Sequence, residues 1–343
     1  MEFTLRHAQR VQHSLSGKMV AVVGAGPAGL AAANELTSFG HKVDVYDQMP
    51  EPGGLLLFGI PEERISKQSV RECVRQLKSC GVDFHCRIKV GEDIRFGDLI
   101  RDYDAVLVAT GAWKSNEIGI AGEHLKGVHY ALDYIIQYNL AKLGYLGFSE
   151  IPALGGHVVV VGGGLTAVDA CAVALERGAT DVSLVYRRTR AHAPAGQHMI
   201  KKLIASGVKF MELTQPIEFI GNDRDGVVAL KAVKTELLTA GTGTRPKPVP
   251  IQGSEHLIKV DSVLLATGLS PVLPFGGDGF RIEIDKSRNA KVMDAHGSEL
   301  KKVFLAGDAL YGPSYVAPAV RSGVRAALNI HESLSRQRSS EAV

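Results

Sequence analysis

Three glycines in one short turn are the first residues whose type and spacing could do chemistry. Gly24 permits a tight turn after an apolar run, Gly26 lets a pyrophosphate approach the backbone, and Gly29 allows the following helix to pack closely. The N-terminus of that helix would present unpaired N–H groups to the phosphates. Asp47 lies about twenty residues further on, where such a site uses a carboxylate to accept hydrogen bonds from ribose hydroxyls. The pattern predicts a dinucleotide site, and the alternative is a glycine turn that serves packing only.

A second turn of the same kind occurs later in the chain. Gly162 and Gly164 occupy the first two glycine positions, and Ala167 occupies the third. The next apolar run ends in Arg187 and Arg188 instead of an acid. Guanidinium groups at this point suit a ribose 2′-phosphate, which a carboxylate would repel. We therefore expect NADPH rather than NADH here, while the alternative is two solvated surface charges.

The cysteines and histidines do not suggest another reactive centre. The four cysteines are Cys73, Cys80, Cys86 and Cys171, and no two of them form a CxxC pair or an iron–sulfur spacing. The twelve histidines form no HxxxH or HxH group near acids. We expect neither a disulfide framework nor a metal site.

Both turns lie between apolar runs of the kind that form buried parallel strands. The two repeats, each read as strand, turn, helix and strand, are Met19–Asp47 and His157–Arg188. Each is followed at a distance by another apolar run, Tyr103–Gly111 or Val260–Gly268. A third such run, Lys301–Asp308, has no glycine-rich turn of its own. We expect it to complete the first domain, so that the second domain is inserted into the first.

The predicted fold class is therefore α/β, with two Rossmann-like dinucleotide-binding domains. The first domain is expected to comprise residues 18–153 and 275–335, and the second residues 154–274.

Composition limits the classes of partner. Of the 343 residues, 45% are hydrophobic and 22% charged, and a net charge of +3 is too small to argue for nucleic acid or an anionic membrane. We find neither a secretory signal nor an apolar run near the roughly 18 residues that a membrane span needs. The expected location is the cytoplasm.

The chain from Met19 to about Ile330 resembles the small subunit of NADPH-dependent glutamate synthase and related FAD- and NAD(P)-binding pyridine nucleotide oxidoreductases. The motifs that carry this resemblance are VVGAGPAGLAAA, PEPGGLLLFGIPEERI, YDAVLVATG, VVVVGGGLTAVDAC, VYRRTRAHAPA, GSEHLIKVDSVLLATGLSP and VFLAGDALYG. The resemblance implies an enzyme with FAD in the first domain and NADPH in the second. It implies hydride transfer from NADPH to FAD, which needs no dedicated acid or base, so no catalytic residue is predicted.

The resemblance also implies roles for residues outside the two turns. Gly53, Gly54 and Leu55 would lie along the FAD pyrophosphate and flavin. Ile60 and Pro61 would close the flavin pocket.

Further roles concern the ends of later strands. Val90 would give backbone contacts to adenine, and Thr110 and Gly111 would approach the cofactor. Asp308 would hydrogen-bond the ribityl chain, although it could also be only a cap. A helix that begins near Val316 would direct its N-terminus at the flavin pyrimidine edge. The predicted cofactor-binding set also includes Pro27, Ala28, Gln48, Leu165, Thr166, Gly268 and Gly307.

Two departures from the family pattern affect the expected partner and site. The first seventeen or so residues contain no cysteine, whereas glutamate synthase relatives carry a cysteine-rich N-terminal extension for iron–sulfur clusters. The loop after Asp308 is not valine-rich, and Ala193 replaces a methionine. We expect electrons to pass from the flavin to a protein acceptor or a large subunit. The alternatives are a flavin monooxygenase and a non-enzymatic FAD- and NADP(H)-binding redox sensor or scaffold.

Overall fold

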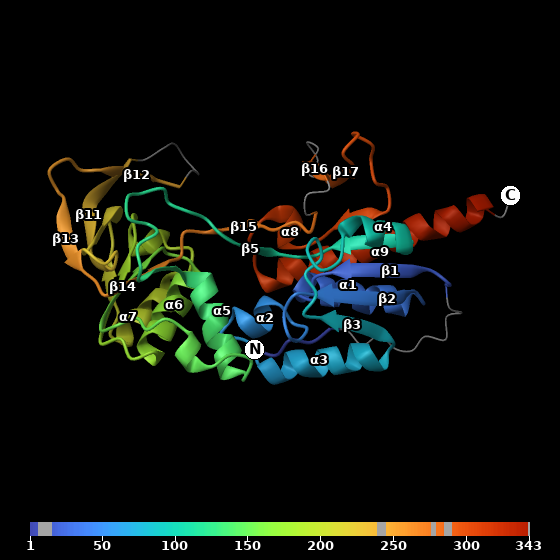
Figure 1. Ribbon diagram of the computed structural model, residues 1–343, viewed down its shortest axis with the longest axis horizontal. Coiled ribbons are helices and arrows are strands. Elements are labelled where there is room, and N and C mark those ends of the chain that lie inside the picture. The colour runs from blue at the N-terminus through green and yellow to red at the C-terminus, as the bar shows by residue number, and fades with distance from the viewer. Residues whose placement is uncertain (6–15, 239–244, 276–278, 285–289, 342–343) are drawn as a thin grey trace. The chain divides into compact units, whose positions relative to one another are not determined.

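The chain folds into two compact units (Figure 1). The computed structural model describes residues 1–5, 16–238, 245–275, 279–284 and 290–341. One unit contains Met1–Lys114 and Leu269–Val343, and the other contains Ser115–Gly268. The second unit therefore interrupts the first along the sequence.

The first unit is built on a five-stranded parallel sheet with the order β18-β4-β1-β2-β3. Its strands are β1 (Met19–Val23), β2 (Lys42–Asp47), β3 (Val82–Cys86), β4 (Ala105–Val108) and β18 (Val303–Leu305). Most strand residues are buried because helices cover both faces of the sheet, as the continuous valine runs predict.

The helices of the first unit divide between the two faces. α1 (Pro27–Ser38) packs along α9 (Val316–Glu341) on one face, where they contact β1, β2, β4 and β18. α4 (Phe96–Asp102) lies on the other face, where Phe96 shares a core with Ala21 and Val23. The remaining helices of this unit are α2 (Leu55–Phe58), α3 (Lys67–Ser79) and α8 (Asp308–Tyr311).

The second unit repeats this plan. Its five-stranded parallel sheet has the order β6-β14-β7-β8-β9. The strands are β6 (Val128–Tyr130), β7 (His157–Val161), β8 (Asp181–Val185), β9 (Lys209–Met211) and β14 (Ser262–Leu265).

The two faces of the second sheet are covered by different kinds of element. The helices α5 (Ala131–Lys142), α6 (Leu165–Glu176) and α7 (Gln197–Ala205) share one core with alternate strand residues. The opposite face packs against an antiparallel sheet through Phe219 and Leu230. The strands of that sheet are β10 (Thr214–Gly221), β11 (Val227–Leu238), β12 (Lys247–Pro250) and β13 (His256–Lys259).

Short elements complete the chain. The strands β5 (Ala112–Ser115) and β15 (Leu269–Pro271), at which the chain passes between the units, pair with each other. β16 (Arg281–Ile284) and β17 (Ala290–Met293) are an antiparallel pair. Two 3-10 turns cover Phe148–Glu150 and Arg190–His192.

The predicted architecture is confirmed, although the units divide at other positions than the expected domain boundaries. Both strand, turn, helix and strand repeats are present, and β18 joins the first sheet beside β4. Residues 115–153, which we expected in the first domain, lie in the second unit because β6 pairs with β14 and α5 packs against α6. Residues 269–274 lie in the first unit.

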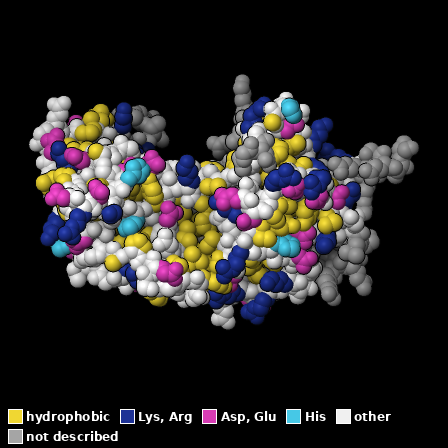
Figure 2. All heavy atoms as spheres, viewed as in Figure 1, with side chains coloured by type: hydrophobic (Ala, Val, Ile, Leu, Met, Phe, Trp, Pro, Cys, Tyr) yellow, Lys and Arg dark blue, Asp and Glu magenta, His cyan; other side chains and the backbone are white. Residues whose placement is uncertain are grey.

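Charges of both signs are interspersed on the face that Figure 2 shows. No helix among the described residues is long and apolar enough to cross a membrane.

Candidate cofactor-binding sites

The first glycine-rich turn contains two glycines that the protein itself requires. Gly24 has φ of +106°, and a Cβ there would lie 2.4 Å from the carbonyl oxygen of Ala109. A Cβ on Gly29 would lie 1.9 Å from the carbonyl oxygen of Gly24. Neither position accepts a side chain, so packing alone explains both glycines.

Gly26 is different, because a Cβ there would meet no protein atom within 4 Å. Its φ of −74° is one that any residue adopts. Folding therefore does not explain the missing side chain, whereas close approach of a ligand to the backbone does.

The helix that begins at this turn has an N-terminus suited to an anion. Gly26 is the N-cap and offers no side-chain cap, and Pro27 follows in the first turn. The first turn contains no acidic residue. The free N–H groups and the positive end of the helix dipole favour negative charge at this place.

Asp47 holds the turn to the end of β2. Its Oδ2 accepts a hydrogen bond from the Ala25 N–H at 2.6 Å, and its Oδ1 accepts one from the Met49 N–H at 2.8 Å. Burial raises the pKa of this carboxyl group to about 6, while the two N–H donors oppose the rise. A carboxylate oxygen accepts more than one hydrogen bond, so the predicted bonds from ribose hydroxyls stay open to Asp47. The neighbouring Gln48 is exposed.

The predicted Gly53–Gly54 segment lies directly on the first turn. The Gly53 N–H donates to the carbonyl oxygen of Ala25 at 2.9 Å. Gly54 has φ of +52°, and a Cβ there would lie 2.9 Å from the Cα of Gly26. The structure thus brings together two segments that are separate in the sequence.

A buried lysine, which the sequence analysis missed, fixes the loop after Gly54. The Lys67 amine donates to the carbonyl oxygen of Leu56 at 2.7 Å and to that of Ile60. Leu55 begins α2, and Ile60 and Pro61 follow it half-buried. A side chain without a donor in place of Lys67 would remove the hydrogen bonds to these two carbonyl oxygens.

Other predicted residues follow β4 and β18 at the same edge of the sheet, because parallel strands end together. The Thr110 hydroxyl donates to the carbonyl oxygen of Val272 at 2.6 Å, and Gly111 has φ of +79°. Asp308 begins α8 and accepts a hydrogen bond from the Ser314 hydroxyl at 2.6 Å. The Asp308 side chain is half-buried, so it is not sealed in the core.

Ala28 is enclosed by two glycines from the end of the chain. A Cβ on Gly307 would lie 2.8 Å from the Ala28 Cβ, and a Cβ on Gly323 would lie 2.1 Å from the Ala28 carbonyl oxygen. The α9 helix begins at Val316, as predicted, and packs closely against the start of α1. Val90 is buried near the end of β2, where the Ile88 N–H donates to the Asp47 carbonyl oxygen at 3.0 Å.

In the second glycine-rich turn, as in the first, packing requires one glycine and leaves open space at the Cβ position of another. Gly162 has φ of +148°, and a Cβ there would lie 2.5 Å from the carbonyl oxygen of Ala266. A Cβ on Gly164, the N-cap of α6, would meet no atom within 4 Å. Ala167 is fully buried in the third position. Leu165 and Thr166 are the first helical residues, and Gly268, with φ of +108°, lies where the chain leaves the unit.

The two arginines predicted to contact a 2′-phosphate follow β8. The exposed Arg187 guanidinium donates no hydrogen bond to any residue that the structure describes. Arg188 Nε donates to the carbonyl oxygen of Pro246 at 2.9 Å. Pro246 directly precedes β12, and no role for it was predicted from the sequence.

The four cysteines form no disulfide, and burial disfavours the thiolate of three of them. Cys73, Cys80, Cys86 and Cys171 are all free. Burial raises the pKa of Cys73 to about 11 and that of Cys86 to about 11, and it raises the pKa of Cys171 still further. Reactive cysteines have lowered pKa values, so these three suit packing better than electron transfer. Among the described residues, no group of three or more potential metal ligands is found.

Comparison with known proteins identifies relatives over most of the chain. A family model described as pyridine nucleotide-disulphide oxidoreductase matches residues 18–323. The glutamate synthase [NADPH] small chain of Azospirillum brasilense is 39% identical over 323 residues, which are 92% of this chain and 66% of that protein. The NADP(+)-dependent formate dehydrogenase subunit beta of Moorella thermoacetica is 35% identical over 336 residues, 96% of this chain and 45% of that protein.

The chain thus spans less than two thirds of both relatives. Among solved structures, Mycobacterium tuberculosis FprA in complex with NADPH superposes with a TM-score of 0.78 at 20% identity, covering 94% of this chain and 86% of that one. The predicted resemblance to the glutamate synthase small subunit and the predicted fold class are confirmed.

Proposed function

The chain belongs to the pyridine nucleotide-disulphide oxidoreductase family, and from this premise we propose that it takes a hydride from NADPH onto FAD and passes the electrons to a partner protein. The names of the two relatives, an NADPH-dependent small chain and an NADP(+)-dependent subunit beta, support this proposal because both describe one part of an assembly.

One observation carries the assignment of two nucleotides. Each unit has a parallel sheet with a glycine at a helix N-terminus, Gly26 or Gly164, whose absent side chain no protein atom requires. Both glycines also follow a buried strand and cap the N-terminus of a helix, where the missing side chain leaves the N–H groups open to a phosphate. We therefore assign one dinucleotide to each unit.

The side chains near each turn indicate which of the two cofactors it would bind. Asp47 at the end of β2 suits the ribose hydroxyls of FAD. Arg187 and Arg188 at the end of β8 suit the 2′-phosphate of NADPH, which a carboxylate would repel. When bound, FAD supplies the two-electron acceptor for the nicotinamide hydride. The protein then has to bind the two cofactors, orient them and exclude water from between them. None of these tasks needs a proton-transfer residue.

The first unit would hold FAD through backbone groups and a few side chains. The N–H groups at the start of α1 would bind the pyrophosphate, and Asp47 the ribose. Gly53 and Gly54 would let the cofactor pass close to the backbone, and Asp308 would accept hydrogen bonds from the ribityl hydroxyls. The N-terminus of α9 at Val316 would favour negative charge.

Reduction of a protein disulfide is not part of this proposal, in spite of the family description. The four cysteines are free in the structure, and burial keeps three of them protonated at neutral pH. The proposed route is therefore from flavin to an acceptor outside the described chain.

Anaerobic mixing of the flavin-loaded protein with NADPH tests the proposal. We expect the visible absorbance of the flavin to bleach after mixing with NADPH. NADH should bleach it more slowly. No bleaching at millimolar NADPH would leave the redox sensor or scaffold as the better assignment. Oxygen consumption that depends on an added organic substrate would favour the flavin monooxygenase.

A further inference from the structure

The end of β8 is surrounded by four arginines that differ in how their charge is balanced. Arg190 forms an ion pair with Glu212 at 3.3 Å, and the Glu212 carboxylate also accepts the Arg190 N–H at 2.8 Å. Arg187, Arg188 and Arg245 form no ion pair with any described residue. Three positive charges therefore have no anionic partner among the residues that the structure describes.

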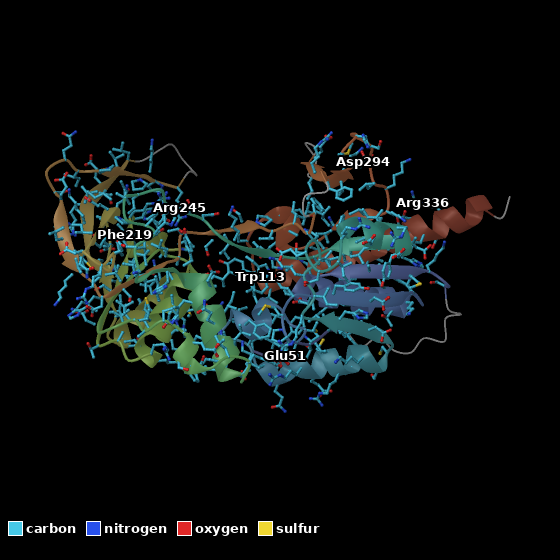
Figure 3. All side chains as sticks on the ribbon, in the orientation of Figure 1. Glu51, Trp113, Phe219, Arg245, Asp294 and Arg336 are labelled. Atoms are coloured by element: carbon cyan, nitrogen blue, oxygen red, sulfur yellow. The ribbon has the colours of Figure 1, made fainter. Side chains whose placement is uncertain are left out.

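Arg245 reaches this place from a distant part of the chain. It lies on the segment between β11 and β12 (Figure 3). Its Nη2 donates to the Tyr186 hydroxyl and to the carbonyl oxygen of His192. The next residue, Pro246, accepts the hydrogen bond from Arg188 Nε at 2.9 Å. Arg245 and Pro246, directly before β12, are thus connected by hydrogen bonds to residues at and after the end of β8.

Tyr186 links Arg245 to the second glycine-rich turn. The Tyr186 ring is buried under Gly163, where a Cβ would lie 2.5 Å from ring carbon Cε2. The Tyr186 hydroxyl donates to the His192 carbonyl oxygen at 2.9 Å. The Arg245 guanidinium therefore lies one tyrosine ring away from the turn. Among the described residues, its hydrogen bonds go to two neutral oxygens. A phosphate competes well for such a guanidinium, because hydrogen bonds between charged partners are stronger than those to neutral oxygens.

We propose that Arg245 is a third cation of the 2′-phosphate site and sets the preference for NADPH over NADH. This inference rests on the proposed function. The 2′-phosphate is favoured over the pyrophosphate because Arg245 is joined through Pro246 to Arg188, at the position after the second strand where a 2′-phosphate is bound. Arg245 exchanges its contact with the His192 carbonyl oxygen for the phosphate when the nucleotide binds.

Calorimetric titration of the FAD-loaded protein with two nucleotides tests this inference. Adenosine 2′,5′-bisphosphate carries the 2′-phosphate, whereas 5′-ADP carries a pyrophosphate and no 2′-phosphate. For Arg245→Gln we expect the Kd of the bisphosphate to rise about tenfold, as for the loss of one charge-assisted hydrogen bond, and the Kd of 5′-ADP to change far less. Arg245→Lys keeps the charge without the planar fork and should give an intermediate Kd.

Arg224→Gln is the matched control, because Arg224 is an exposed arginine of the same unit whose substitution removes the same charge. It should leave both Kd values unchanged. The inference is overturned if Arg245→Gln binds the bisphosphate as tightly as the wild type, or if it weakens both nucleotides equally. Failure of the wild type to bleach with NADPH would instead overturn the proposed function, which the titration does not test.

Discussion

The Asp47 carboxylate accepts the N–H of Ala25 at 2.6 Å, so the acid at the end of β2 also holds the first glycine-rich turn in place. A single buried side chain thereby connects two elements that a cofactor would contact together. Its ionisation should therefore be coupled to cofactor binding.

The pH dependence of FAD affinity follows from this coupling. The pKa of Asp47 in the protein, about 6, lies above its ordinary value of 3.8. Protonated Asp47 therefore favours the folded apoprotein at low pH, and this contribution to stability is lost as the pH rises through about 6. Ribose hydroxyls that donate to the carboxylate favour its ionised form, so FAD affinity should rise by about tenfold between pH 5 and 7.

Flavin fluorescence titrations of the apoprotein would measure this effect, and Asp47→Asn should remove the pH step. FAD binding near pH 6 should also release protons. Calorimetry in two buffers with different heats of protonation would detect this release without a variant. A wild-type affinity that stays constant from pH 5 to 8 would contradict the expectation.

Gly26→Ala should weaken FAD binding without unfolding the protein. The added methyl group would meet no protein atom within 4 Å. It would occupy the side from which, in the proposed function, the pyrophosphate approaches. Crowding of this kind costs about 1–3 kcal/mol, so we expect roughly a five- to hundredfold higher Kd for FAD. The measurement is the flavin content after purification together with the Kd.

Gly97→Ala is the matched control for this variant. Gly97 lies in α4 of the same unit, and a Cβ there also meets no atom within 4 Å. Normal FAD binding in Gly97→Ala together with normal binding in Gly26→Ala would show that Gly26 does not border the cofactor.

Gly164→Ala should weaken NADPH binding without affecting FAD binding. It is the equivalent substitution in the second unit, where a Cβ again meets no atom within 4 Å. We expect full FAD content but a higher NADPH concentration for half-maximal flavin reduction, by roughly five- to hundredfold. Loss of FAD from this variant would contradict the assignment of one nucleotide to each unit.

Gly323→Ala should lower stability, because its Cβ would lie 2.1 Å from the Ala28 carbonyl oxygen. The required separation of α9 from α1 should cost about 1–3 kcal/mol. Gly97→Ala should have the opposite sign and stabilise the protein by about 0.5–1 kcal/mol, because alanine is the better helix former. Thermal unfolding of both variants in the presence of saturating FAD measures the difference. An unchanged Tm for Gly323→Ala would mean that the two helices separate without cost.

The parts of the fold that short-range patterns specify were predictable. Gly29 is required by a contact with the Gly24 carbonyl oxygen inside one strand, turn and helix, so the glycine spacing alone indicates this local structure. Gly24 is required by the carbonyl oxygen of Ala109 after β4, a contact that the local sequence does not indicate. The insertion was predictable because the run Lys301–Asp308 has the same apolar pattern as the earlier strands but no turn of its own.

The parts that depend on distant pairing were not predictable. β6 belongs to the second unit because Val128 pairs with Val263, and no local feature of residues 115–153 indicates that partner. Arg245 contacts Tyr186, 59 residues earlier, through a segment whose glycines, threonines and prolines indicate only a loop. The Asp47 carboxylate was predicted as a cofactor ligand, but its bond to the Ala25 N–H depends on the path of the backbone.

The position of β18 and α9 after the inserted unit has a consequence for biosynthesis. While the ribosome is still translating residues before Val303, β4 has no neighbour on its outer side and α1 lacks its packing partner. The inserted unit, Ser115–Gly268, has already been synthesised in full when the chain reaches Val303. Protein synthesis thus makes the whole second unit available for folding before the sheet of the first unit can be completed.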